Sequence, residues 1–339
     1  MSNTIQTVFL VDTHVSILNN LGKDGSSNYE NSVAVKKIKK EGRTHTYVSG
    51  QAFRNWLRTT LGDSYNWNLS PITRDKKIAF TAANPVEYED DDLFGYMKAE
   101  KKETLTRISP LKNSALISVT PVNILEEFKV MARQEGDSVP YADQPYSAIL
   151  KGILSLDITS LGAFTTVHRA GYMNCTKEYV GTYFDKLTEV DDPRFYKNKD
   201  ELHKKYLLPK EERVKRASDL LKALNKISGG ASQTSHLTDV TPKFIVLAGV
   251  EGGNHIFSHL ISESMERTTE FSIDALNEIM EDYKDEIKTP VYIGRRKGFM
   301  DRWDKDLKEL AEKNSNIIYG SPVEIINQFV ENDKFKELF

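Results

Sequence analysis

Residues 47–62 constrain the fold of this chain more than any other stretch. Ser49 is a favourable N-cap, because its hydroxyl can accept a hydrogen bond from the free amides of a first helical turn. Gly62 is a natural end, since glycine tolerates the left-handed conformation that closes many helices. Between them the apolar residues recur at helical spacing, at Phe53, Trp56, Leu57 and Leu61. The stretch therefore predicts an amphipathic helix that packs on a core.

The other face of this helix is polar and carries Gln51, Arg54, Asn55 and Arg58. The two arginines are four residues apart, where like charges slightly destabilise a helix. Such a pair beside amide side chains indicates an anionic ligand, and a solvated helix face is the alternative. If both arginines contact phosphates, replacing them with alanine should flatten the log–log salt dependence of RNA binding by roughly 0.7 per lost contact.

The charge and cysteine content exclude several classes of protein. The 339 residues carry a formal net charge of -3, so a nucleic-acid site here must be a local patch rather than a basic surface. The single cysteine, Cys175, excludes an internal disulfide and a cysteine-based zinc site. No run of apolar residues is long enough for a membrane span, and the N-terminus does not resemble a signal peptide. We therefore expect a cytoplasmic protein with no membrane partner.

The order of elements predicts an α+β fold. Residues 7–17 alternate as a strand, with Val15 among the side chains of one face, and a basic hairpin at residues 33–48 leads into the helix. This order indicates a helix packed on one face of a sheet. Further strands are expected at residues 77–81, 114–119, 149–166, 244–250 and 291–293, short helices at 178–207, and longer helices at 210–227, 273–286, 300–313 and 323–331.

Two irregular segments are candidates for ligand binding. Residues 98–113 have no helical or strand period and include Pro110, which is typical of a surface loop or of a loop that becomes ordered on a ligand. Residues 229–235 begin with two glycines, which would let backbone amides approach a phosphate closely. A plain helix C-cap is the alternative for this pair.

No motif for a cofactor or metal is complete. His255 and His259 are four residues apart, as in some metal sites, but nothing nearby completes a ligand set. Residues 249–253 lack both a dinucleotide fingerprint and a phosphate-binding lysine. Asp12 and His14 share a strand face and could perform acid–base chemistry on RNA, although the polar end of an edge strand explains them equally well.

Three motifs, taken in order, resemble a known family. They are residues 49–54 with 56–58, residues 92–97, and residues 107–111 before a strand. Together they resemble the backbone subunit of type I CRISPR interference (Cascade) complexes, which is the Cas-seven family of the repeat-associated (RAMP) superfamily. The DevR-like subgroup of subtype I-B is the most similar. The resemblance is specific up to about Val119, looser from about Ile149 to Val250, and has no matching motif in the remaining residues.

The resemblance implies a single domain over residues 1–339. Its core, or palm, would have the RRM/ferredoxin-like fold, and large insertions would give the molecule a hand-like shape with a finger and a thumb. The implied additions are a finger at about residues 84–113, an insertion at about 120–150, a helical and loop insertion at about 177–241, and a C-terminal helical extension at about 272–339.

The resemblance also implies a function without catalysis, metal or cofactor. Copies of the subunit would assemble head to tail along a guide RNA (crRNA), with the other Cascade subunits, and support pairing of the guide with a target DNA strand. The expected RNA-binding residues are Ser49, Gln51, Arg54, Asn55, Arg58, Lys98, Arg107, Lys112, Gly229, Gly230 and Ser232.

Two other functions stay open at this point. The first is a metal-dependent endoribonuclease of the same superfamily, with Asp12, His14 or an aspartate of residues 90–92 as the active group. The second is a small-molecule α/β enzyme, for which the sequence offers no cofactor motif.

Overall fold

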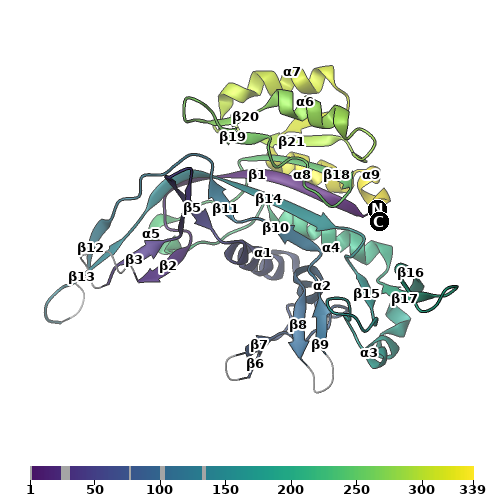
Figure 1. Ribbon diagram of the computed structural model, residues 1–339. Coiled ribbons are helices and arrows are strands. Elements are labelled where there is room, and N and C mark those ends of the chain that lie inside the picture. Colours follow the sequence, from purple (N-terminus) through teal and green to yellow (C-terminus); the bar gives the residue numbers. More distant parts are fainter. Residues whose placement is uncertain (1, 24–30, 76–77, 100–103, 132–134) are drawn as a thin grey trace.

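A computed structural model describes residues 2–23, 31–75, 78–99, 104–131 and 135–339 of the chain (Figure 1). Two predicted insertions are therefore described only in part. Residues 100–103 of the finger and residues 132–134 of the next insertion lie outside the described residues.

Six elements form the core. They are β1 (Asn3–Ser16), α1 (Gly50–Tyr65), β11 (Leu116–Ser118), β14 (Tyr146–Asp157), α4 (Lys210–Ala223) and β18 (Phe244–Glu251). The four strands lie in the order β18-β1-β14-β11, and each is antiparallel to its neighbours. Two interleaved strand–helix–strand units with this strand order make the ferredoxin-like core. The predicted fold class, an α+β RRM-like core with insertions, is confirmed.

Alternation along β1 explains why this strand lies at the centre. Phe9 and Val11 enter one hydrophobic cluster, whereas Val8 and Leu10 enter another on the opposite face of the sheet. The strand begins earlier than the sequence pattern indicated. Its register with β14 shifts near its end, where Val15 has a φ of 46° and is exposed. The predicted alternation therefore fails at Val15, because the irregularity breaks it.

Additional strands widen the sheet on both sides. On one side are β5 (Arg43–Val48) and β4 (Lys37–Lys40), and β10 (Leu111–Asn113) also pairs with β14. On the other side are β21 (Val291–Arg295) and β22 (Ile317–Gly320), which are parallel. The C-terminal segment, predicted as a helical extension, thus also supplies two strands. Its helices are α6 (Ile273–Asp282), α7 (Asp304–Lys313), α8 (Pro322–Glu331) and α9 (Asp333–Glu337), with a 3-10 turn η2 (Asp301–Trp303).

Helices cover both faces of the sheet. Figure 1 shows α6 and α7 on one side and α1 and α4 on the other. Residues of α1, α4, α8 and α9 form one cluster with the sheet, and residues of α6, η2 and α7 form the second. The two ends of the chain meet at one edge, where Asn3 Nδ2 donates to the Leu338 carbonyl at 3.0 Å.

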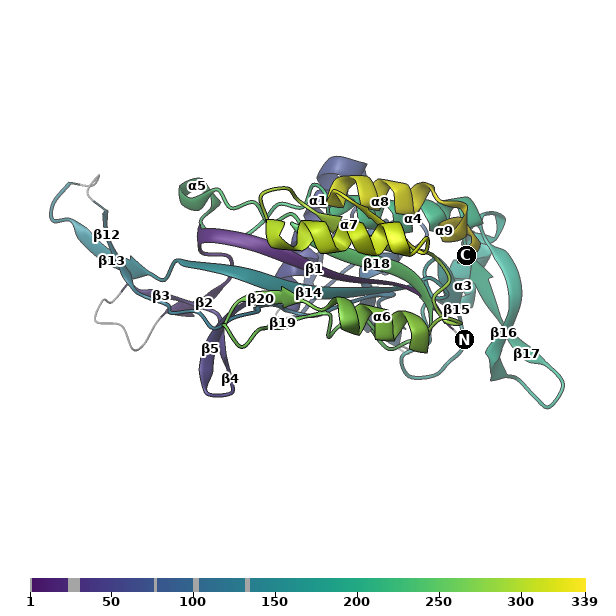
Figure 2. The ribbon, with the colours of Figure 1, turned by 90° about the horizontal axis from the view of Figure 1, so that it is seen from above.

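Hairpins project from this core (Figures 1 and 2). The finger contains β6 (Thr73–Asp75), β7 (Ile78–Phe80), α2 (Glu89–Phe94), β8 (Tyr96–Ala99) and β9 (Thr104–Arg107). The next insertion contains β12 (Glu127–Met131) and β13 (Val139–Asp143). The third contains α3 (Lys177–Thr182), η1 (Phe184–Lys186), β16 (Thr188–Tyr196), β17 (Leu202–Leu207) and α5 (Gln233–His236), with β15 (Ala163–Thr165) pairing on β17. The smaller pairs are β2 (Asn20–Lys23) with β3 (Val33–Val35), and β19 (Ile261–Glu263) with β20 (Thr269–Phe271).

Two local predictions are wrong in these hairpins. Residues 98–113 are not aperiodic, because they contain part of β8, then β9 and β10. Residues 178–207 are only partly helical, because β16 and β17 form an antiparallel hairpin. Both hairpins stand away from the two large clusters, so their strands lack the regular apolar alternation that marks a half-buried strand.

Candidate nucleic-acid interface

Helix α1 begins as its sequence predicts but ends later. Ser49 Oγ accepts a hydrogen bond from the Ala52 amide at 3.3 Å, which confirms the N-cap. The helix continues past Gly62 to Tyr65 and closes on Asn66, whose φ is 55°. A Cβ at Gly62 would lie 2.8 Å from the Leu69 side chain. Glycine at this position therefore provides close packing rather than a helix end.

The outward face of α1 is polar, and it is uncharged from Gln51 to Thr59 before it reaches the exposed Asp63. Gln51, Asn55 and Thr59 follow one another at four-residue spacing and are exposed; we call them the outer stripe. Phe53, Trp56, Leu57 and Leu61 are buried on the opposite side, as predicted. The outer stripe can donate and accept hydrogen bonds, but it adds no charge.

Arg54 does not belong to this outward face. Its Nη1 donates to the Leu111 carbonyl at 2.9 Å and to Asn113 Oδ1 at 3.1 Å. Its Nη2 donates to the Phe94 carbonyl at 2.9 Å and to Ser109 Oγ at 2.8 Å. Burial, with a smaller effect from a neighbouring arginine, lowers the pKa of Arg54 to about 10. The guanidinium ties α1 to the finger, which argues against its predicted contact with RNA phosphate.

Arg58 turns towards the same side. Its guanidinium lies 4.7 Å from the centre of the Phe94 ring, and its Nε is 3.2 Å from Asp90 Oδ2. One third of the side chain stays exposed. Arg58 therefore remains available for a partial contact with an anion, unlike Arg54.

The glycine loop packs directly against α1. A Cβ at Gly229 would lie 2.3 Å from the Trp56 ring, and one at Gly230 would lie 2.7 Å from the Leu18 side chain. Helix α4 ends at Ala223, so the pair is not a helix C-cap. Close packing on α1 and on Leu18, just after β1, explains both glycines. Ser232 is exposed beside them.

Several backbone segments meet at the start of α1. The Ser49 amide donates to Asn19 Oδ1 at 2.8 Å, and the Ala231 amide donates to the Leu18 carbonyl at 3.2 Å. On the finger side, Asn113 Nδ2 donates to the Gly50 carbonyl at 3.3 Å. The start of α1 thus lies between the glycine loop and the base of the finger. The structure brings together predicted site residues that are far apart in the sequence.

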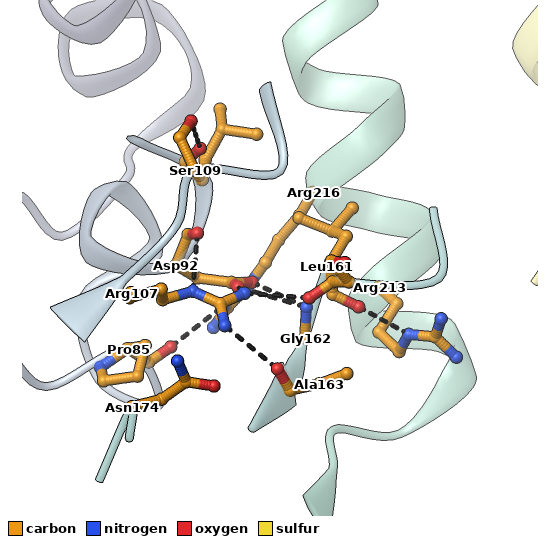
Figure 3. A network of polar contacts seen from close by, with 12 residues as sticks. Pro85, Asp92, Arg107, Ser109, Leu161, Gly162, Ala163, Asn174, Arg213 and Arg216 are labelled. Atoms are coloured by element: carbon orange, nitrogen blue, oxygen red, sulfur yellow. Dashed lines mark hydrogen bonds and ion pairs between the residues drawn. The ribbon is translucent and has the colours of Figure 1, made fainter. Parts of the chain in front are cut away.

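Arg107 lies inside a network at the base of the finger, which we call the Asp92 clamp (Figure 3). The Asp92 carboxylate is fully buried and pairs with the guanidiniums of Arg107 and Arg216. Arg107 also donates to the carbonyls of Ala163 and Ser160, each at 2.9 Å. Only 4% of Arg107 is exposed. This burial argues against the predicted contact between Arg107 and RNA.

The clamp joins the finger to α4 and to the loop after β14. Arg216 on α4 donates to the Pro85 carbonyl at 2.9 Å, and the Gly162 amide donates to both Asp92 oxygens at 3.1 Å. Arg213 binds the Leu161 carbonyl at 2.8 Å (Figure 3). Sequence reasoning missed Arg213 and Arg216 as structural residues. Their helical spacing could have revealed this role, because it places them on the buried face of α4 with Ala217, Leu220 and Leu221.

The neighbouring aspartates are also structural. Asp90 and Asp91 are almost completely buried. Asp90 Oδ1 accepts from the Ser70 amide at 2.8 Å, and Asp91 Oδ2 accepts from the Asn84 amide at 2.9 Å. Burial raises the pKa of Asp90 despite these bonds. Buried and internally bonded carboxylates are not positioned to bind a catalytic metal, which argues against this cluster as an active site.

The remaining candidates lie elsewhere. Lys98 Nζ donates to the Ala82 carbonyl at 3.3 Å within the finger. Lys112 is exposed, but strand alternation turns it to the face of β10 opposite Asn113. Asp12 and His14 lie near the end of β1, with Oδ2 and Nε2 3.2 Å apart.

The two histidines considered for a metal do not share a helix. His255 is partly buried with Nε2 3.1 Å from the Thr7 carbonyl, whereas His259 is exposed in a turn. Among the residues placed by the structure, no group of three or more histidine, cysteine or acidic side chains could hold a metal ion. Within the same residues, no helix is both long enough and apolar enough to cross a bilayer.

Comparison with known proteins places this geometry in a family. The family described as CRISPR-associated negative auto-regulator DevR/Csa2 matches residues 8–268. No curated protein matches the chain in sequence. A chain of a pre-nicking CRISPR RNA-guided surveillance complex has a similar fold, with a TM-score of 0.54 at 12% identity over 97% of this chain and 99% of that chain. A chain of a second CRISPR RNA-guided surveillance complex has a TM-score of 0.50 at 10% identity, over 97% of this chain and 98% of that chain. This protein is a member of the CRISPR-associated DevR/Csa2 family.

Proposed function

We propose that this protein is a non-catalytic subunit of a CRISPR surveillance complex and that it binds guide RNA at the start of α1. The observation that carries the proposal is the agreement of two findings over most of the chain. The DevR/Csa2 family matches residues 8–268, and chains from RNA-guided surveillance complexes share the fold along nearly the whole length.

The geometry at α1 supports a strand of RNA along this helix. The outer stripe is exposed, lies between the finger base and the glycine loop, and offers two amide side chains and a hydroxyl. Such groups form hydrogen bonds with phosphate and sugar oxygens without reading the base. Arg58 adds a partly exposed positive charge beside the stripe.

A modest site on each copy is sufficient if many copies bind one strand. We propose that copies assemble head to tail along the guide in the cytoplasm, with other Cascade subunits, and hold the guide for pairing with target DNA. Linked contacts of this kind multiply affinity through effective concentration. A net charge of -3 accords with a protein that binds RNA only along one local surface.

The proposal gives the protein no catalytic step. The buried partners of Asp90, Asp91 and Asp92 support it, because each carboxylate already serves a structural contact. If the protein were instead an endoribonuclease, Asp12 and His14 would be its candidate acid–base pair. Incubation of labelled single-stranded RNA with the protein, with and without magnesium, tests that alternative, and intact RNA is the expected result.

Binding by the outer stripe is tested with the double variant Gln51→Ala/Asn55→Ala. Each lost hydrogen bond is worth about 0.5–1.5 kcal/mol, so affinity for single-stranded RNA should fall about 5- to 150-fold. Asn277→Ala is the matched control, because it removes an exposed amide from α6 on the opposite face of the sheet. Equal affinities of the two variants would contradict the interface. Mass measurement of the RNA complex should show protein copies increasing with RNA length.

A further inference from the structure

A pocket of about 260 Å³ opens beside the face of β10 that carries Lys112. Its wall includes Lys112, Asp157, Thr165, Tyr172, Asn174 and Arg194. Ser109 also lines it, and the same Ser109 accepts a hydrogen bond from Arg54 of α1 at 2.8 Å. The pocket is therefore separated from α1 only by the base of the finger.

The Tyr172 ring lines this pocket and lies near two guanidiniums, of which that of Arg194 also lines the pocket. Arg169 lies 5.8 Å and Arg194 lies 6.0 Å from the centre of the Tyr172 ring. The Phe195 ring meets Tyr172 edge-on at 5.0 Å and supports it from behind. Asp192 holds Arg194 through two hydrogen bonds of 2.8 and 2.7 Å, yet about half of the Arg194 side chain remains exposed. The ring and its cations are thus held in place before any ligand arrives.

The charge in the pocket is positive and available. Lys112 is exposed, and its ammonium has no hydrogen bond or ion pair within the described part of the chain. The one carboxylate on the wall, Asp157, is already occupied. Its oxygens accept from Ser2 Oγ at 2.6 Å, Ser160 Oγ at 2.7 Å and the Thr159 amide at 3.0 Å. An anion entering the pocket would therefore meet Lys112 and the half-exposed Arg194, and a carboxylate that is already hydrogen-bonded.

We infer that this pocket binds one nucleotide of a single-stranded nucleic acid. The base stacks on Tyr172 and its guanidiniums, and Lys112 with Arg194 binds the adjoining phosphate. Aromatic rings and arginine planes stack unpaired bases, and lysine attracts phosphate. The inference rests on the proposed function, to which it adds a second contact on the same strand.

The size and chemistry of the pocket favour a nucleotide over other anions. Pockets for a complete small ligand measure about 300–1,000 Å³. A smaller, open pocket suits one unit of a chain that continues outside it. An acidic peptide would use the cations but not the ring, so Tyr172 distinguishes the two ligands.

Three variants of the full-length protein test the pocket. Tyr172→Leu removes the ring and should reduce affinity for single-stranded RNA about 5- to 100-fold. Tyr172→Phe keeps the ring and should bind as the wild type does, since the Tyr172 hydroxyl makes no hydrogen bond to any residue that the structure describes. Lys112→Gln removes one phosphate contact and should flatten the log–log salt dependence by roughly 0.7. An oligonucleotide carrying 5-iodouridine should cross-link to Tyr172 in the wild type.

The outcomes separate this inference from the proposed function. If the wild type binds no RNA, both fail. If the Gln51→Ala/Asn55→Ala variant loses affinity while Tyr172→Leu and Lys112→Gln bind like the wild type with unchanged salt dependence, only the pocket inference fails. If polyglutamate displaced the cross-linked oligonucleotide, and Tyr172→Phe and Tyr172→Leu lost RNA affinity equally, the pocket would be a site for an acidic peptide. That result would overturn the inference that it binds a nucleotide.

Discussion

At the scale of single residues, the two arginines of α1 contact the base of the finger. A guanidinium has five N–H donors in a fixed plane, so one arginine can serve several carbonyl groups. Arg54 uses this geometry to contact the end of α2, the connection before β10, and β10 itself. Its spacing from Arg58 indicated a shared anion, but the common partner is the Phe94 ring, 5.1 Å and 4.7 Å from the two guanidiniums.

Replacing Arg54 should therefore affect folding rather than the salt dependence of RNA binding. Arg54→Ala removes the guanidinium donor of the Phe94 carbonyl and leaves the Leu111 carbonyl with Ser109 Oγ as its side-chain donor, and a charged hydrogen bond is worth about 1.5–3 kcal/mol. We expect a loss of about that size in the free energy of urea unfolding, with an unchanged log–log slope for RNA. Gln51→Ala, on the exposed stripe of the same helix, is the control and should leave stability within about 0.5 kcal/mol. If the Arg54→Ala protein were fully stable and its RNA binding depended less steeply on salt, Arg54 would contact an RNA phosphate after all.

At the scale of elements, a buried polar network fixes the finger to the palm beside the apolar packing of α2. The Asp92 clamp connects α2 and β9 of the finger with α4 and the loop after β14. A small apolar cluster (Ala83, Tyr96, Leu105 and Met173) accompanies it, and Leu93 and Phe94 of α2 join the main cluster of the palm. A buried charge network of this kind requires all of its partners, because a single unpaired charge in the interior is costly.

Removal of the Asp92 charge should release the finger. Asp92→Asn leaves Arg107 and Arg216 facing a neutral group, and breaking a buried pair typically costs about 3–5 kcal/mol. We expect urea unfolding to reveal a loss of this order and limited proteolysis to cut the finger faster. Glu281→Gln makes the same change from carboxylate to amide in an exposed pair with Lys284, where little stability should be lost. Similar losses in both variants would show that the clamp contributes no more than a surface pair.

At the scale of the whole molecule, the sequence predicts what is periodic and local. Phe9 and Val11 marked β1, and Ser49 with Phe53 and Leu57 marked α1, because a strand or helix on a core repeats at its own period. The role of Arg107 could not be read in the same way. Its burial depends on Asp92, on Arg216 and on carbonyls more than fifty residues away, which only the folded chain brings together.

The sheet also makes the two hydrophobic clusters one folding unit. Strand β1 gives Phe9 to one cluster and Val8 to the other, and β18 divides Ile245 and Phe244 in the same way. Neither cluster can lose its strands while the other stays intact. A chain of this length often separates into domains, but shared central strands favour cooperative unfolding.

Phe335→Ala tests this cooperativity from the far end of the chain. Phe335 is fully buried in α9 within the cluster of α1, and its ring lies 5.3 Å from that of Phe329. Truncation of a buried phenylalanine costs about 3–5 kcal/mol, so the slowest-exchanging amides should exchange at least about 100-fold faster. Because the sheet is shared, that acceleration should be equal at Leu57 of α1 and at Leu307 of α7, in the opposite cluster. Hydrogen exchange read by mass spectrometry measures both helices in one experiment. If α7 kept the wild-type exchange rate while α1 lost protection, the two faces of the sheet would be separate units, and the shared strands would not couple them.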